Sequence, residues 1–92
     1  MTVSTLALPE RLTLAEADQT LVRLGGDPAQ QADAMVVVNA GSLKVFDSSA
    51  LAVLLELRRR LLAQGKTLRV NGWPPRLEDL AALYGVRDLL AA

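Results

Sequence analysis

The continuous apolar run Ala34-Met35-Val36-Val37-Val38 constrains the fold of this chain more than any other feature. β-branched residues favour strands, and a run without polar alternation is typical of a strand that is covered on both faces. We therefore expect this run to be the central strand of a sheet. Two shorter strands are predicted beside it, at Val3 to Leu8, where Pro9 stops the pattern, and at Thr67 to Asn71.

Helical segments alternate with these strands. Thr13-Leu14-Ala15-Glu16 fits a capping box and opens a helix that ends at Gly25-Gly26. A long helix runs from Ala50 to about Gln64, a third ends at Gly85, and Arg87 to Ala92 could add a short turn. The residues expected on the apolar faces of the first and third helices are Leu14, Ala17, Leu21 and Leu24, and Leu77, Leu80, Ala81 and Tyr84.

This alternation predicts an α/β fold, a small sandwich with a mixed, mainly parallel sheet and helices packed on it. The chain has 92 residues, so we expect residues 1–92 to form a single domain.

The helix after Asp47 carries two apolar lobes. The sheet-facing lobe contains Ala50, Val53, Leu54, Leu57 and Leu61, and a second lobe contains Leu51, Leu55 and Leu62. The second lobe could pack on a neighbouring helix or face a partner, and the sequence leaves both open. We interpret Arg58-Arg59-Arg60 as a solvated run that complements the helix dipole.

Composition excludes several functions. Ten Lys and Arg balance ten Asp and Glu, which makes nucleic acid an unlikely partner. The chain has neither His nor Cys, which rules out thiolate and imidazole metal sites and Ser-His or Cys-His catalysis, so we predict no metal, no cofactor and no enzymatic activity. The longest apolar run, Ala50 to Leu55, is far shorter than the roughly 20 residues of a membrane helix. The start of the chain lacks a secretion signal, which favours the cytosol.

Asp47-Ser48-Ser49 is the polar cluster with a plausible chemical role. Asp or Ser at this point can simply cap the helix. Alternatively, a hydroxyl at a helix N-terminus lies where the dipole and free amides favour negative charge, so a phosphate on Ser48 or Ser49 could alter a docking surface. The two interpretations remain open from the residues alone.

The segment Val45-Phe46-Asp47-Ser48-Ser49-Ala50-Leu51 resembles the signature of STAS domains, the family named for sulfate transporters and anti-sigma-factor antagonists. Nearly the whole chain shares the likeness. Within the family, the aliphatic helix after Ser49 and the ending Leu80-Ala81-Ala82-Leu83-Tyr84-Gly85 are most similar to the small MlaB type. Ala50 stands where the family usually has Gly, and Asn39 where many members have Asp.

The resemblance implies a non-enzymatic cytoplasmic subunit, peripheral to the inner membrane, that binds and regulates the ATPase of an ABC transporter moving phospholipids between the inner and outer membranes. The alternative that it implies is an anti-sigma-factor antagonist switched by phosphorylation of Ser48. The partner-binding or regulatory residues carried over are Asp47, Ser48, Ser49, Leu51 and Asn39. The strand that precedes Thr5 in the family is short here, so we also expect a bare sheet edge and a possible homodimer.

Overall fold

The computed structural model describes residues 3–25 and 34–90 and shows an α/β arrangement. Every helix and strand predicted from the sequence is present, and the described ends lie within two residues of those expected. Gly26 and Ala92, which were predicted to end two of the helical segments, lie outside the described residues. The elements are β1 (Val3–Ala7), β2 (Arg11–Leu12), α1 (Leu14–Gly25), β3 (Met35–Asn39), β4 (Val45–Phe46), α2 (Ser49–Ala63), β5 (Thr67–Asn71), α3 (Pro75–Leu83) and α4 (Arg87–Leu90).

The main sheet has the strand order β1-β3-β5, and both pairings are parallel. Val36 of β3 lies opposite Ser4 of β1 and Leu68 of β5. Since β3 is paired on both sides, the prediction that the Ala34 to Val38 run forms the central strand is confirmed. Helices lie between successive strands of this sheet, as parallel pairing requires.

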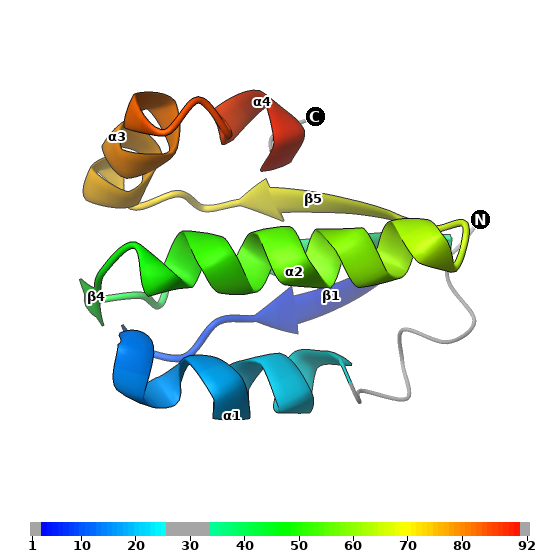
Figure 1. Cartoon of the computed structure of the whole chain (residues 1–92), viewed down its shortest axis with the longest axis horizontal. Helices are drawn as coiled ribbons and strands as arrows, with labels where there is room; N and C mark the ends of the chain where they lie inside the picture. The colour runs from blue at the N-terminus through cyan, green and yellow to red at the C-terminus, as the bar shows by residue number, and fades with distance from the viewer. Residues whose placement is uncertain (1–2, 26–33, 91–92) are drawn as a thin grey trace.

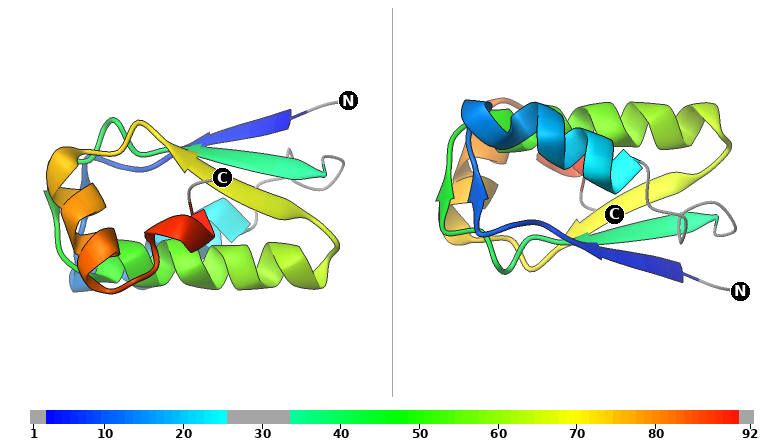
Figure 2. Two further views of the ribbon diagram at one scale, coloured as in Figure 1. Left: turned by 90° about the horizontal axis from the view of Figure 1, so that it is seen from above. Right: turned by 90° about the horizontal axis from the view of Figure 1, so that it is seen from below.

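The helices lie on one side of the three-stranded sheet, with α2 across its middle, α1 along one flank, and α3 and α4 along the other (Figures 1 and 2). Side chains alternate accordingly: Val36 and Val38 are buried, whereas Met35 and Val37 are only half-buried. The expectation that this strand is covered on both faces is therefore wrong. The apolar run reflects β-branched strand propensity in addition to burial.

The sheet-facing lobe of α2 forms the centre of the core. All of its members are at most 3% exposed, as predicted: Ala50, Val53, Leu54, Leu57 and Leu61. They belong to one cluster with Leu6, Val36, Val38, Leu68 and Val70 of the sheet. The helix is thereby fixed to the sheet along most of its length, which sets the position of its N-terminus.

The apolar face of α1 differs from the prediction at its first residue. Thr20 and Leu24 are buried and Ala17 and Leu21 pack partly against the core, whereas Leu14 is 78% exposed. On a helical wheel with about 100° per residue, Thr20 and Leu24 lie at about 240° and 280° from Leu14, so Leu14 lies about 100° from their midpoint. Half of the predicted capping box is present: Glu16 Oε1 accepts the Thr13 backbone N–H at 2.9 Å and the Thr13 hydroxyl at 2.7 Å. The other half differs, because the Thr13 hydroxyl oxygen accepts the Ala15 N–H at 3.3 Å, and the Glu16 N–H donates to the Thr13 carbonyl.

The second lobe of α2 is largely covered from within the domain. Leu51 is 3% exposed, Leu55 packs partly against the core and Leu62 is 45% exposed. Arg58, which had been assigned only a solvated role, is half-buried, and its Nε donates to the Leu89 carbonyl of α4 at 3.0 Å. Arg58 therefore ties the C-terminal half of α2 to the last helix.

Two short strands were not predicted. β2 and β4 form a separate parallel pair in which Leu12, fully buried, lies opposite Phe46. Two-residue strands show no periodicity, so the sequence gives no signal for them. β4 leads directly into Asp47, and this small sheet thus helps to position the start of α2.

β1 lies at an edge of the main sheet, with no further strand beside it among residues 3–25 and 34–90. The homodimer expected for a bare edge stays a prediction. Within the same described ranges, no helix combines the length and the apolar content needed to span a membrane.

Candidate docking surface around Ser48

Asp47 caps two helices at once. Its Oδ1 accepts the Ser49 N–H of α2 at 2.8 Å, and its Oδ2 accepts the Leu14 N–H of α1 at 3.3 Å. These hydrogen bonds, above all that from the Ser49 amide, hold the pKa of the Asp47 carboxyl below its usual value, although partial burial acts in the opposite direction. Asp47 is therefore ionised near neutral pH and joins the N-termini of α1 and α2.

Ser48 is exposed at the N-cap position of α2, and its hydroxyl makes no capping hydrogen bond. The first four amides of the helix already have acceptors: Asp47 serves those of Ser49 and Ala50, and the Ser48 carbonyl serves those of Leu51 and Ala52. The expectation of free amides beside Ser48 is therefore wrong. Asp47 performs the capping, which leaves the Ser48 hydroxyl available to another molecule.

An apolar groove begins at Ser48 and runs between α2 and the segment that joins α3 to α4. It has a volume of about 330 Å³ and is lined by Ser48, Leu51, Ala52, Leu55, Tyr84 and Val86. Leu51 was expected to face a partner, but its side chain is almost entirely in the core and forms the groove's floor. Tyr84, which was expected on the buried face of α3, is instead 58% exposed.

A second, smaller groove lies on the other side of Ala52, between α1 and α2. Its lining includes Leu14, Leu21, Ser49 and Ala52. Ala52 is exposed and belongs to both grooves, so it forms a low ridge between them. The small side chain at this position lets an approaching protein come close to the α2 backbone.

Exposed apolar residues line the two grooves. Leu14 is 78% exposed in the groove beside α1, and Tyr84 is 58% exposed in the groove beside the end of α3. Sequence analysis missed Leu14 and Tyr84 because both fit the apolar periodicity of their helices. Together with Ser48 and Ala52, these residues define what we call the Ser48 surface, whose large exposed apolar side chains are typical of a protein-binding site.

Asn39 contacts a different part of the chain. Its Oδ1 accepts the Gly41 N–H at 2.8 Å, and a Cβ built on Gly72 would lie 2.6 Å from the same oxygen. Asn39 and Asn71 occupy equivalent positions at the ends of β3 and β5. The structure thus brings Asp47, Ser48, Ser49 and Leu51 together in one helical turn, whereas the described contacts of Asn39 hold the loops after β3 and β5.

The Ser48 surface offers a hydroxyl and exposed apolar side chains. Within residues 3–25 and 34–90, no group of three or more His, Cys, Asp or Glu side chains could hold a metal ion. The carboxylate nearest to Ser48 in sequence, Asp47, is engaged by two backbone amides. A hydroxyl next to an apolar groove suits recognition by another protein or modification at the serine.

The described elements form a small α/β module with exposed apolar residues around the start of α2. A family model described as "Mlab, STAS domain" matches residues 2–91, and the chain therefore belongs to the STAS domain family. A comparison with curated proteins found no significant match. The family membership supports a regulatory or interaction role.

Two solved structures share the fold. A sulfate transporter family protein from Wolinella succinogenes superimposes with a TM-score of 0.76 at 17% identity, over 97% of this chain and 71% of that one. The STAS domain of a SulP transporter from Vibrio cholerae gives a TM-score of 0.68 at 14% identity, over 97% of this chain and 68% of that one. At these identities the likeness concerns the fold alone.

Proposed function

We propose that this chain is a non-enzymatic STAS subunit that binds and regulates the cytoplasmic ATPase of an ABC transporter moving phospholipids between the inner and outer membranes. The observation that carries the proposal is the exposed Ser48 hydroxyl, which is free of any capping role and lies beside an apolar groove. The description of the matching family model supports the choice of the MlaB type.

The Ser48 surface has the properties that docking to a folded partner needs. Its apolar side chains would lose water on contact, and a hydroxyl at the groove's end would fix the partner's register through a hydrogen bond. The neighbouring helix ends are held by Asp47, so docking requires little ordering of the backbone. In this proposal the partner handles ATP, and the STAS subunit acts in the cytoplasm, peripheral to the inner membrane through that partner.

Affinity purification of the tagged chain from its native cells, followed by a search for a co-purifying ABC ATPase, tests the proposal. Ser48→Glu and Ala52→Arg place a charge or bulk on the Ser48 surface and should reduce binding at least tenfold, with thermal midpoints close to that of the wild type. Thr67→Glu is a matched control, because Thr67 is an exposed hydroxyl residue at the start of β5. Unchanged binding by both surface variants, or an ATPase that never co-purifies, would contradict the proposal.

A second function, an anti-sigma-factor antagonist switched by phosphorylation, is favoured by the same free hydroxyl. A phosphate on Ser48 would add about two negative charges at an exposed position without displacing a cap. Mass spectrometry of the protein isolated from cells would detect this phosphate. Recovery of a kinase-like anti-sigma factor in place of an ABC ATPase would decide for this alternative.

The possible homodimer is a separate proposal. β1 contains no charged residue and no proline, so its outer edge could pair with a strand of a second copy. Analytical ultracentrifugation across a concentration series tests this, and a monomer at every concentration would exclude it.

A further inference from the structure

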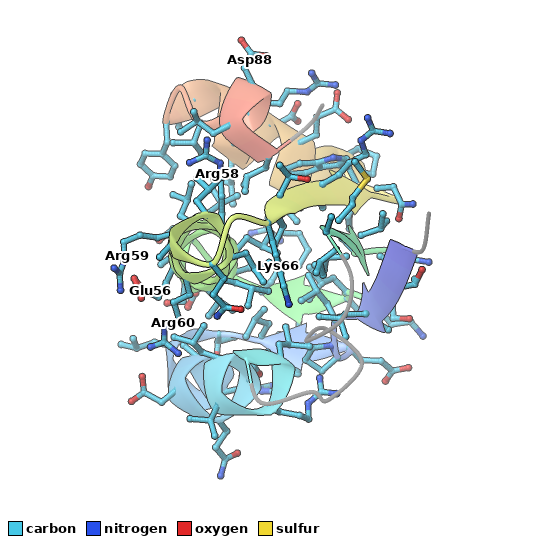
Figure 3. The ribbon with its side chains drawn as sticks, turned by 90° about the vertical axis from the view of Figure 1, so that its right-hand side faces the viewer. Glu56, Arg58, Arg59, Arg60, Lys66 and Asp88 are labelled. Carbon is cyan, nitrogen blue, oxygen red and sulfur yellow. The ribbon has the colours of Figure 1, made fainter. Side chains whose placement is uncertain are left out.

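The outward face of α2 continues beyond the Ser48 surface into a charged half. Glu56, Arg59 and Arg60 follow Ala52 on the exposed side of the helix, and Figure 3 shows their side chains projecting away from the sheet. Arg59 and Arg60 lie seven and eight residues after Ala52, which corresponds to about 11 Å along a helix. One helix face thus carries an apolar site and a charged site two turns apart.

The charged half of the outward face of α2 has a net positive charge. Arg59 donates to both Glu56 oxygens at 2.7 and 2.6 Å, and Arg60 Nε donates to Glu56 Oε2 at 3.0 Å, so two guanidinium groups share one carboxylate. Arg58 adds a third positive charge, and its Nε is bound to the neutral Leu89 carbonyl. Asp88 is directed away from these arginines on the far side of α4 (Figure 3).

The arginines keep room for additional carboxylates. The side chains of Arg59 and Arg60 are 70% and 47% exposed, whereas that of Glu56 is 29% exposed. A guanidinium group has five N–H donors, and the contacts to Glu56 use two from Arg59 and one from Arg60. The remaining donors favour planar carboxylate acceptors.

We propose that the outward face of α2 docks an amphipathic helix of a partner protein. Its apolar residues enter the groove lined by Leu55 and Tyr84, and its acidic residues contact Arg59 and Arg60. The inference rests on the proposed docking function and specifies the chemistry of the partner. The partner helix carries its apolar cluster and its Asp or Glu residues about two turns apart, since the two sites on α2 have that spacing.

The observations favour an acidic protein segment over an anionic lipid surface. Lipid-binding basic clusters usually contain four to eight Lys or Arg, whereas Arg58, Arg59 and Arg60 are offset by Glu56 and the chain has no net charge. A bilayer also presents no side chains that would enter the narrow groove between Leu55 and Tyr84. A helix supplies both the apolar side chains and the carboxylates.

Two synthetic helical peptides of about 18 residues test the inference without any natural partner. Both carry the same Leu cluster, and two turns away one carries Glu and the other Lys. We expect the Glu peptide to bind at least tenfold more tightly at low salt, and the preference to shrink at high salt. NMR shifts should map to Ala52, Leu55, Tyr84, Arg59 and Arg60.

The variant Arg59→Gln/Arg60→Gln should weaken binding of the Glu peptide about fivefold to tenfold, because each exposed ion pair contributes modestly. Arg69→Gln is the matched control, since Arg69 is exposed and points to the opposite face of β5 from the buried Leu68 and Val70. Equal affinity for both peptides, no binding of either, or an unchanged preference in the double variant would overturn the inference. So would arginine-dependent binding to phosphatidylglycerol vesicles without a peptide preference.

The peptide experiment and the co-purification experiment fail independently. If the Glu peptide binds as expected but no ABC ATPase co-purifies, the acidic partner is another protein and only the proposed function is wrong. If the ATPase binds and the double variant binds it equally well, the Ser48 surface alone makes the contact and the inference on the charged half is wrong.

Discussion

Replacing Gly72 with alanine tests how the loops at the carboxyl ends of the strands are held. Gly72 has a φ of 67°, a backbone conformation that side chains disfavour. A Cβ at this position would lie 2.6 Å from Asn39 Oδ1 and 3.1 Å from the Gly41 nitrogen. Asn39 would have to move, and its 2.8 Å hydrogen bond from the Gly41 N–H would be lost.

The expected magnitude follows from comparison with two other glycines. Gly65 and Gly85 have φ values of 76° and 70°, and a Cβ at either would meet nothing within 4 Å. Gly65→Ala and Gly85→Ala should therefore cost only the left-handed strain, about 1–2 kcal/mol of unfolding free energy. Gly72→Ala adds the lost hydrogen bond, worth about 1 kcal/mol, for a total of about 2–3 kcal/mol.

Urea denaturation of the three variants measures these free energies. The role of Asn39 is tested by making Gly72→Ala in a protein that already carries Asn39→Ala. Without Oδ1 at position 39, the excess cost of Gly72→Ala over Gly65→Ala should fall by about 1 kcal/mol, and only the 3.1 Å approach to the Gly41 nitrogen should remain. Equal costs for Gly72→Ala and Gly65→Ala, or an excess that is undiminished in the Asn39→Ala background, would refute the assigned role of Asn39.

Three further predictions concern α2. Leu54→Asp should abolish folding, seen as loss of helical circular dichroism, because it buries a carboxylate at a fully buried position and removes a core side chain worth about 2–5 kcal/mol. Asp47→Ala should lower the thermal midpoint by several degrees more than Ser48→Ala, since only Asp47 accepts capping bonds; equal shifts would argue against this division. Hydrogen bonds from Arg59 lower the pKa of Glu56 to about 2 from an ordinary 4.5, so its stabilising contribution is present above pH 4.5 and is lost as the pH falls toward 2. Glu56→Gln should flatten the urea midpoint across this pH range, and an unaltered pH profile would count against the ion pairs.

Sequence reasoning succeeded where one strong pattern decided the outcome. The β-branched run forms the central strand β3, and the residues that the helical wheel assigned to the sheet-facing lobe of α2 are buried. Gly65 and Gly85 follow α2 and α3 with positive φ, as their helix-ending role predicts. These features depend on short-range preferences and on burial against a single sheet, which a local pattern reports well.

The errors arose where tertiary packing selected among equivalent apolar residues. Leu14 and Tyr84 fit the periodicity of α1 and α3, but the core contacts of each helix turn these end residues outward. Periodicity averages over a helix and does not report which terminal residue leaves the core. For a similar reason, the sequence did not show that the helices pack on one face of the sheet. A β-branched run has the same composition whether one or both of its faces are packed.

The division of roles between Asp47 and Ser48 was also beyond the sequence, since either side chain can cap a helix. The geometry assigns the task to Asp47 because α1 and α2 begin side by side, so that one carboxylate reaches the Leu14 and Ser49 amides together. The carboxylate has two acceptor oxygens, one for each helix end, whereas a serine hydroxyl has one oxygen on a shorter side chain and could not join both ends in this way. The helix pair thus selects an acid at position 47, and that choice leaves the Ser48 side chain exposed at the helix start without a capping role. A residue that folding does not need is one that a partner or a kinase can use.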